Sequence, residues 1–162
     1  MRRSAFDCLL LKAYKIYQFS VLLLLLSGCD RHTLLHTYQS IPNNEWNRSD
    51  TLLFTLPQAA ADVCYTLHIG LRTTQLFPYQ GVMLAVEQDC QHPTVHREDT
   101  VFYRLARPDG NIMSEGIHYS QSEAVNLPLQ LQQGQSCQIR IRHLMQRETL
   151  PGIADVGIHV RH

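Results

Sequence analysis

The chain carries no net charge. Its 162 residues include 14 basic and 14 acidic side chains, so the formal charge at pH 7 is zero when the nine histidines are neutral. Domains that bind nucleic acid present a basic surface to the phosphate backbone. The balanced composition therefore excludes nucleic acid as an expected partner.

The chain also lacks a hydrophobic run long enough to cross a membrane. Its apolar stretch, Phe19 to Leu26, has about eight residues, whereas a spanning helix needs roughly 20. Lys12 and Lys15 prevent this stretch from extending toward the N-terminus. A basic segment, a short apolar core and small residues at its end are typical of an export signal. We therefore interpret residues 1–28 as a signal peptide.

The end of this signal, Leu26-Ser27-Gly28-Cys29, resembles the bacterial lipobox. The small residues before Cys29 let the peptide bond enter the processing peptidase, and the Cys29 thiol is alkylated by a diacylglycerol group. Cleavage then makes Cys29 the N-terminus. Two or more acyl chains anchor a protein stably, because each buried CH₂ contributes about 0.8 kcal/mol. We predict that Cys29 is lipidated and attaches the protein to membrane lipid.

Removal of the first 28 residues, with their four bases and one acid, leaves 134 residues and a net charge of about −3. This length corresponds to one domain. Residues 29–49 are polar and rich in turn-formers such as Pro42, so we expect a lipidated tether and an irregular lead-in that Tyr38 and Trp46 dock onto the domain. Residues 50–162 would form the folded domain.

No segment of this domain has a sustained 3.6-residue apolar period, and its apolar residues alternate with polar ones instead. The alternating segments are 52–56, 63–71, 82–86, 101–105, 125–131, 137–141 and 156–160. Turn-formers separate them, with Pro108-Asp109-Gly110 expected at a hairpin. The pattern predicts an all-β fold, a single antiparallel β-sandwich of about seven strands. Pro128 removes a donor from its strand, which we therefore place at a sheet edge.

The number of cysteines beyond the signal is odd. Cys8 belongs to the signal and Cys29 takes the lipid, which leaves Cys64, Cys90 and Cys137. Strand phase places Cys90 and Cys137 with the core-facing residues and Cys64 on the opposite face. No pair is obvious, so we expect buried, unreactive thiols, although the periplasm would permit a disulfide.

Motifs of catalysis are absent. The chain has no G-x-S-x-G, no H-E-x-x-H and no glycine-rich phosphate loop, so we expect no enzyme. A hydrolase whose site is not visible in the sequence is an alternative, after the two binding functions described below. Residues 90–99 offer cysteine, histidine and acidic side chains, but their spacing matches no closed zinc site. We interpret them as a polar connection and expect no metal and no cofactor besides the covalent lipid.

A recognition site is the remaining possibility. The loop 73–81 concentrates Phe77, Pro78 and Tyr79 between two strands. Exposed aromatic residues on sandwiches stack on sugars or anchor protein partners, whereas a loop of this kind can also plug the end of the core. Arg72, just before the loop, is a candidate to pair with a carboxylate such as Asp155.

Four runs carry a family resemblance. They are YQSIPNNEWNRSD (38–50), LRTTQLFPYQGVML (71–84), LARPDGNIMSEGI (105–117) and HLMQRETLPGIADVGIHV (143–160). In this order behind a lipobox, they resemble the gliding-motility lipoprotein GldH family of the Bacteroidetes over nearly all of the mature chain. The resemblance implies a lipid-anchored accessory protein of the gliding and associated type IX secretion machinery, with no enzyme activity and no catalytic residues.

The resemblance also selects residues. The matched positions are Tyr38, Trp46, Arg72, Pro78, Tyr79, Gly110, Gly152, Asp155 and Gly157. Our candidate partner-binding residues are Trp46, Arg72, Phe77, Tyr79 and Asp155. Surface-exported lipoproteins of this phylum tend to carry an acidic run after the lipidated cysteine. The single acid here, Asp30, favours an outer-membrane anchor that faces the periplasm.

The alternative is a glycan-binding lipoprotein of the same fold. It would use Trp46, Phe77, Tyr79 or Tyr119 as stacking platforms. A flat row of aromatic side chains on one sheet face would favour a sugar ligand. A compact apolar patch with a polar rim would favour a protein partner.

Overall fold

The computed structural model describes residues 32–105 and 120–162, with the backbone alone for residues 120–125. The predicted signal peptide, Cys29, the predicted hairpin turn at 108–110 and Tyr119 lie outside the described residues. Within the described part, no helix is long and apolar enough to cross a membrane.

The described chain is built almost entirely from strands. They are β1 (Thr33–Ser40), β2 (Glu45–Asn47), β3 (Leu52–Thr55), β4 (Val63–Thr73), β5 (Gly81–Gln91), β6 (Val95–Arg104), β7 (Ser120–Leu131), β8 (Ser136–His143), β9 (Thr149–Pro151) and β10 (Ile153–Arg161), with a short 3-10 helix η1 (Pro42–Asn44) before β2. All pairings between them are antiparallel. The predicted all-β fold is confirmed, with about ten strands rather than seven.

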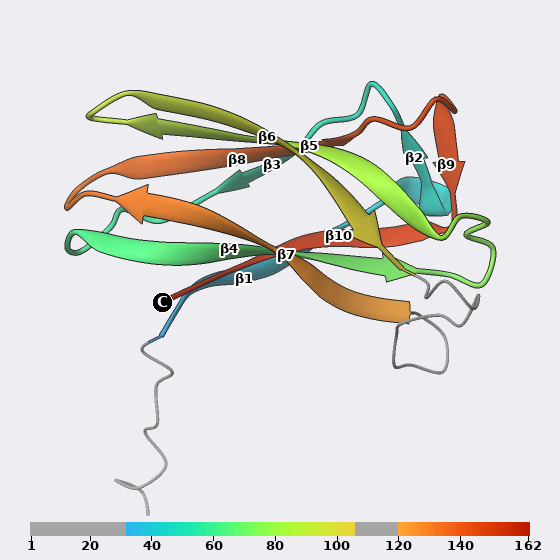
Figure 1. The fold of residues 1–162 in the computed structure, drawn as a ribbon, viewed down its shortest axis with the longest axis horizontal. Coiled ribbons are helices and arrows are strands. Elements are labelled where there is room, and N and C mark those ends of the chain that lie inside the picture. Colours follow the sequence, from blue (N-terminus) through green and yellow to red (C-terminus); the bar gives the residue numbers. More distant parts are fainter. Residues whose placement is uncertain (1–31, 106–119) are drawn as a thin grey trace, which may run out of the picture. The chain divides into compact units, whose positions relative to one another are not determined.

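Two four-stranded sheets face each other as a sandwich (Figure 1). The first sheet has the order β1-β10-β4-β7 and the second has the order β3-β8-β5-β6, while β2 and β9 form a small separate ladder. The alternation in sequence explains the core, because every second residue of a strand faces the opposite sheet. Fully buried positions include Leu67, Ile69, Val156, Ile158, Val82, Leu84, Ile139 and Ile141.

The lead-in is more ordered than we expected. We predicted a tether or irregular wrap before residue 50, but the structure forms β1 and β2 there. Strand β1 pairs with β10 along its length, from Thr33 opposite Arg161 to Ser40 opposite Asp155. None of its residues is fully buried, since β1 is an edge strand. Its sequence therefore lacks the clean alternation that revealed the inner strands.

The structure confirms the predicted position of Pro128 and corrects the cysteines. Strand β7, which contains Pro128, ends the first sheet. Cys90 and Cys137 both face the core, as strand phase predicted, but they form a disulfide. They lie directly opposite each other on β5 and β8, and the sequence alone did not reveal that these strands are neighbours. Cys64 is exposed and outside any disulfide.

Candidate functional site

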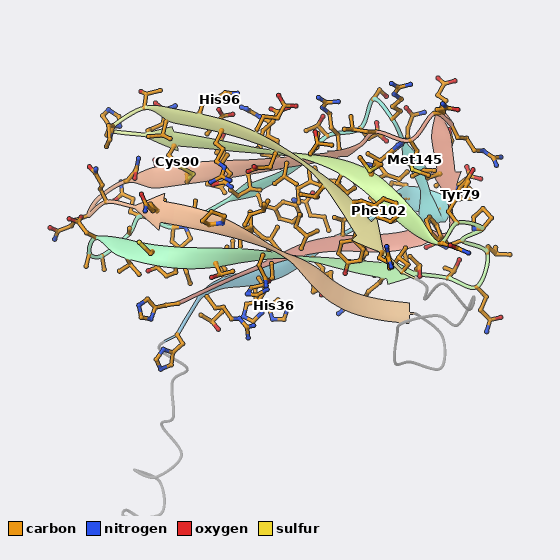
Figure 2. The ribbon with its side chains drawn as sticks, in the orientation of Figure 1. His36, Tyr79, Cys90, His96, Phe102 and Met145 are labelled. Atoms are coloured by element: carbon orange, nitrogen blue, oxygen red, sulfur yellow. A yellow bond between two sulfur atoms is a disulfide. The ribbon has the colours of Figure 1, made fainter. Side chains whose placement is uncertain are left out.

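Three of the four sequence runs converge at one end of the sandwich. Strands β1 and β4 both run antiparallel to β10, so both end where β10 begins (Figure 1). The segments at this end are residues 41–50, 74–80 and 144–153, and we call them the motif end. In Figure 2, Tyr79 and Met145 are labelled at this end and Cys90 is labelled toward the other.

Gly152 joins the three segments of the motif end. Its N–H donates to the carbonyl oxygen of Asn44 at 2.7 Å, and its own carbonyl oxygen accepts from the N–H of Thr74 at 2.8 Å. Its φ is +83°, and an added Cβ would lie 2.7 Å from the Cα of Phe77. Only glycine meets both conditions without strain. The residue occupies the turn between β9 and β10.

Trp46 packs inside the motif end. Its side chain is 0% exposed, its Nε1–H donates to the carbonyl oxygen of Asp50 at 3.1 Å, and its ring meets the ring of His143 edge-on at 5.3 Å. The buried side chain does not reach the surface. The structure therefore contradicts Trp46 as a partner-binding residue and gives it a packing role.

His143 contacts Trp46 through its ring and through a hydrogen bond. Its Nε2–H donates to the carbonyl oxygen of Trp46 at 3.2 Å, and the ring is fully buried. Burial disfavours the charged imidazolium, so desolvation lowers the pKa of His143. The neutral ring thus belongs to the core of the motif end.

Arg72 and Asp155 form the predicted ion pair. They lie opposite each other on β4 and β10, with Nη1 of Arg72 3.8 Å from Oδ2 of Asp155. The Ser40 hydroxyl donates to Oδ1 of Asp155 at 2.6 Å, and the Arg72 guanidinium lies 4.2 Å from the centre of the Tyr38 ring. Three neighbouring strands thus hold this pair on the outer face of the first sheet.

Tyr38 lies against two glycines on the same face. An added Cβ on Gly157 would lie 2.5 Å from Cδ1 of Tyr38, and one on Gly70 would lie 2.9 Å from its Cζ. The Tyr38 ring therefore occupies space that is open only because Gly70 and Gly157 have no side chains. This contact accounts for Gly157 among the matched positions, and it is a fold-critical role.

The loop between β4 and β5 presents an apolar tip, residues 76–79. Phe77 and Tyr79 are half-buried and pack on the core, with their rings 5.6 Å apart at 68°. Leu76 is 78% exposed, and Pro78 is also exposed. The loop therefore covers the end of the core with Phe77 and Tyr79, and it also exposes Leu76 and Pro78 as an apolar surface. Exposed polar residues Gln75 and Gln80 flank the tip.

This arrangement does not form a flat aromatic platform. Trp46 is buried, and the rings of Phe77 and Tyr79 are nearly perpendicular. A compact apolar tip between polar flanks suits a protein partner better than a sugar ring. Of the proposed stacking residues, Tyr119 lies outside the described part of the chain.

The segment 90–99 turns back within the β5–β6 hairpin. Cys90 is held in the disulfide, and Nδ1 of His96 lies 2.5 Å from Oδ1 of Asp89. Across residues 32–105 and 120–162, no group of three or more His, Cys, Asp or Glu side chains is placed to hold a metal ion.

Sequence reasoning missed a charged ladder on the outer face of the second sheet. Arg140 pairs with Glu87 and Asp89, and Arg142 pairs with Glu87 and Glu98. The signal was present, since both arginines alternate with core isoleucines on β8. The opposite charges compensate each other, so this face offers no field of one sign.

The model of the GldH lipoprotein family matches residues 33–160, nearly the whole described domain. The chain belongs to the GldH lipoprotein family. It is similar to the gliding motility lipoprotein GldH of Flavobacterium johnsoniae, with 24% identity over 144 residues, 85% of this chain and 89% of that protein. It is also similar to a gliding motility lipoprotein GldH homolog of Christiangramia forsetii, with 23% identity over 159 residues, 91% of this chain and 95% of that protein.

The GldH match extends the resemblance of the sequence runs to a shared domain. It begins at Thr33, where β1 begins, and it ends one residue before the end of β10. The family domain is thus the sandwich itself, including the first strand that the sequence pattern did not reveal.

Proposed function

We propose that this protein is a lipid-anchored, non-enzymatic component that supports gliding motility and the associated type IX secretion machinery by binding envelope proteins through its motif end. The names of its GldH relatives support the gliding role. The observation that supports the binding role is the apolar tip of residues 76–79. Leu76 is 78% exposed there, while Phe77 and Tyr79 pack on the core.

The anchor in this proposal is the lipid on Cys29. The lipobox ends at Cys29, four residues before the match to a lipoprotein family begins. Membership in that family supports a membrane-anchored place in the cell envelope. We extend this to the outer membrane, with the domain facing the periplasm, because Asp30 is a single acid rather than a run.

The loop that carries the tip is held in a fixed shape. The N–H of Thr74 donates to Gly152, and the N–H of Phe77 donates to the carbonyl oxygen of Thr74 at 3.2 Å. The N–H of Leu76 donates to the Thr74 hydroxyl at 3.2 Å. A preordered loop loses little entropy on binding. Burial of the exposed Leu76 side chain would contribute about 1.5–2 kcal/mol, which corresponds to roughly 10- to 30-fold in affinity.

The absence of catalysis is part of the proposal. A shifted pKa can mark a catalytic group when the group lines a cleft. His143, whose pKa is lowered, is instead fully buried against the Trp46 ring, where a substrate would not reach it.

The test is purification of the anchored protein from cross-linked membranes, followed by mass spectrometry. Wild type is compared with Cys29→Ser, Leu76→Ser and the control Leu53→Ser, since Leu53 is an exposed leucine (45%) on β3. We expect wild type and Leu53→Ser to recover gliding or secretion proteins, and the other two variants to lose them. Equal recovery by Leu76→Ser would contradict binding through the motif end. Recovery of polysaccharide- or nutrient-uptake proteins would favour the glycan-binding alternative.

A further inference from the structure

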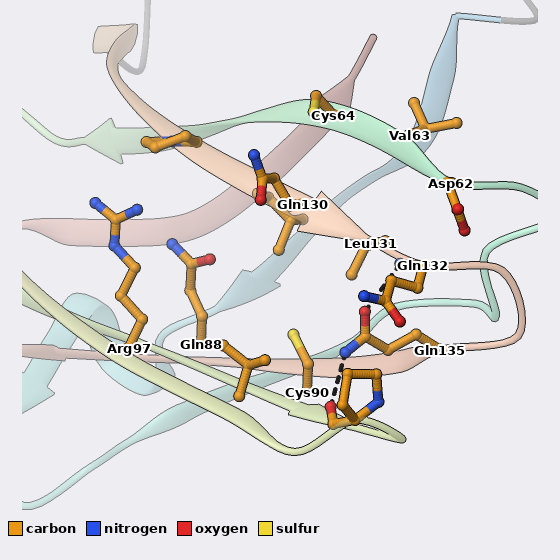
Figure 3. Close-up of a pocket in the computed structure, with 14 residues that line it drawn as sticks. Asp62, Val63, Cys64, Gln88, Cys90, Arg97, Gln130, Leu131, Gln132 and Gln135 are labelled. Atoms are coloured by element: carbon orange, nitrogen blue, oxygen red, sulfur yellow. Dashed lines mark hydrogen bonds between the residues drawn. The ribbon is translucent and has the colours of Figure 1, made fainter.

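A groove of about 630 Å³ opens between the two sheets, near the end of the sandwich where β4 begins (Figure 3). Its floor comes from the β5–β6 hairpin. Its walls come from the start of β4, from the last residues of β7 and from the turn that follows β7. The lining includes Gln88, Cys90, Val95, Arg97, Leu129 and Leu131. The volume is within the range of ligand sites in proteins, roughly 300–1,000 Å³.

The groove opens because β6 and β7 diverge. Where they approach, Tyr103 of β6 is fully buried opposite Val82. Toward the start of β6 the two ribbons separate (Figure 1), and Val95 is 49% exposed although it shares the inward phase of Tyr103. The twist of each sheet rotates its strands relative to one another, which is consistent with this divergence. Within the described residues, the inner face of the hairpin is therefore left partly open at Val95 of β6, while Gln88 and Cys90 of β5 stay buried beside it.

Gln88 lies at the bottom of this groove with an unused hydrogen-bond donor. It continues the inward series of Val82, Leu84 and Val86 on β5 and is only 4% exposed. Its Nε2 has no hydrogen-bond partner. Buried amides are almost always paired, because an unmet donor loses its bonds to water without replacement. The Gln88 amide is therefore placed to donate to an oxygen of a molecule that enters the groove.

A second glutamine in the groove shows the contrast. Gln135 is 2% exposed, and both ends of its amide are used. Its Oε1 accepts from the N–H of Gln132 at 2.9 Å, and its Nε2 donates to the carbonyl oxygen of Pro93 at 2.9 Å (Figure 3). Gln135 thus ties the turn after β7 to the turn of the β5–β6 hairpin. Gln135 therefore holds one wall of the groove in place, whereas the Nε2 of Gln88 has no hydrogen-bond partner.

The lining restricts the chemistry of the ligand. Arg97 binds Asp99 through Nε at 2.7 Å and Nη2 at 3.0 Å, so its charge is compensated and an anion is not favoured. Among the described residues, no aromatic side chain lines the groove, so the described lining gives a sugar ring no stacking surface. Asp62 also lines the groove, and its Oδ1 accepts from the N–H of Gln133 at 2.7 Å. The other lining residues are aliphatic, amide, proline and cysteine residues, which suits an uncharged ligand.

The position between two sheet edges points to a peptide. Among the described strands, β7 ends the first sheet and β6 ends the second. Edge strands carry backbone groups without a ladder partner and accept an additional strand. We infer that the groove binds an uncharged, extended peptide segment of another protein, with a peptide carbonyl oxygen accepting from Nε2 of Gln88. The segment's alternating side chains would rest on Val95, Leu129 and the Cys90–Cys137 disulfide.

This site is independent of the motif end. The groove lies at the start of the 11-residue strand β4 and the apolar tip follows its end. At about 3.3 Å per residue, the seven residues of β5 between Gly81, at the end of the tip loop, and Gln88 span about 23 Å, so the two surfaces are separate. One protein could therefore bind a peptide in the groove and a second partner at the motif end. Loss of binding at one surface need not affect binding at the other.

The test uses the purified mature lipoprotein in detergent micelles and a phage library of random dodecapeptides. Selected peptides are synthesised, and their affinities are measured by fluorescence anisotropy. The variants are Gln88→Leu, which removes the donor, and Val95→Trp, which fills the groove. The control is Phe102→Trp, because Phe102 is 53% exposed on the outward phase of the same strand.

We expect Gln88→Leu to weaken peptide binding about tenfold while its melting temperature stays equal or rises, since leucine removes an unpaired buried amide. Val95→Trp abolishes binding and Phe102→Trp leaves it unchanged. The inference is overturned if no selected peptide depends on Val95, or if Gln88→Leu lowers stability without changing affinity. It is also overturned if an oligosaccharide panel, rather than peptides, shows binding that Val95→Trp abolishes. Recovery of partner proteins through the motif end is measured separately, by the cross-linking purification described above. Its outcome tests the proposed function and does not test the groove.

Discussion

Substitution of Gly70 by alanine tests the seat of Tyr38 on the first sheet. The new Cβ would overlap the hydroxyl oxygen of Tyr38 and lie 2.9 Å from its Cζ and 3.1 Å from its Cε1. Forced overlap in a packed region costs about 1–3 kcal/mol, whereas alanine in an open strand position would gain about 0.5–1 kcal/mol over glycine. We expect Gly70→Ala to lower the free energy of unfolding by about 1–2 kcal/mol, and the melting temperature by about 4–8 °C for a domain of this size.

Urea and thermal unfolding, followed by circular dichroism, measure this change, and Tyr38→Ala supplies the control. The three atoms nearest to an added Cβ at Gly70 all belong to the Tyr38 side chain, so we expect Gly70→Ala to become neutral or stabilising in a Tyr38→Ala background. Gly157→Ala is rescued less, because its Cβ also meets the backbone carbonyl oxygen of Thr37 at 2.7 Å. A stabilising Gly70→Ala in the wild type, or a loss that Tyr38→Ala does not restore, would refute the reasoning.

Three further predictions concern buried groups. Cys137→Ala removes the Cys90–Cys137 disulfide, which joins residues 47 apart in sequence, and should lower the free energy of unfolding in urea by about 4 kcal/mol. The control Cys64→Ala, at an exposed free thiol, should change it by less than about 0.5 kcal/mol. Equal losses in the two variants would contradict this prediction. The folded-state pKa of His143 is lowered below 6.5, so the unfolded state takes up the proton first and stability falls as pH decreases below about 6.5, by at most about 1.4 kcal/mol per pH unit. His143→Gln should flatten that part of the profile, and parallel profiles would argue against it. Trp46, the only tryptophan, is fully buried, so its fluorescence should resist acrylamide until unfolding, and Trp46→Ala should cost about 3–5 kcal/mol; ready quenching of the native protein would count against this burial.

The sequence was sufficient for strands that are buried on one face and insufficient for the rest. Leu67, Ile69 and Leu71 alternate cleanly because each faces the opposite sheet. In β1, neighbours Leu34 and Leu35 are both half-buried, and a register shift between Thr33 and Leu35 interrupts the ladder. Such an edge strand has no simple period, so local pattern does not distinguish it from a polar loop.

The sites divide in the same way. The pair of Arg72 and Asp155 was predictable as a charge match, but its neighbours Tyr38 and Gly70 depend on the register of three strands. Trp46 was misread because an aromatic residue among polar ones does not reveal which way it points. Gln88 did leave a signal, since a glutamine continues the apolar phase of β5. A polar residue at a core position is an error or a functional feature, and only the structure shows the groove above it.

The pairing of β1 with β10 has a mechanical consequence. A lipid on Cys29 would pull the chain from the start of β1, while a partner bound at the motif end would pull from the opposite end of the strands. The load then runs along the strand axis, across a ladder that extends from Thr33 to Ser40. Antiparallel hydrogen bonds lie perpendicular to that axis, so tension shears them all together instead of opening them one after another. If the proposed anchor and partner are both in place, the β1–β10 ladder would resist tension between them in this shear geometry.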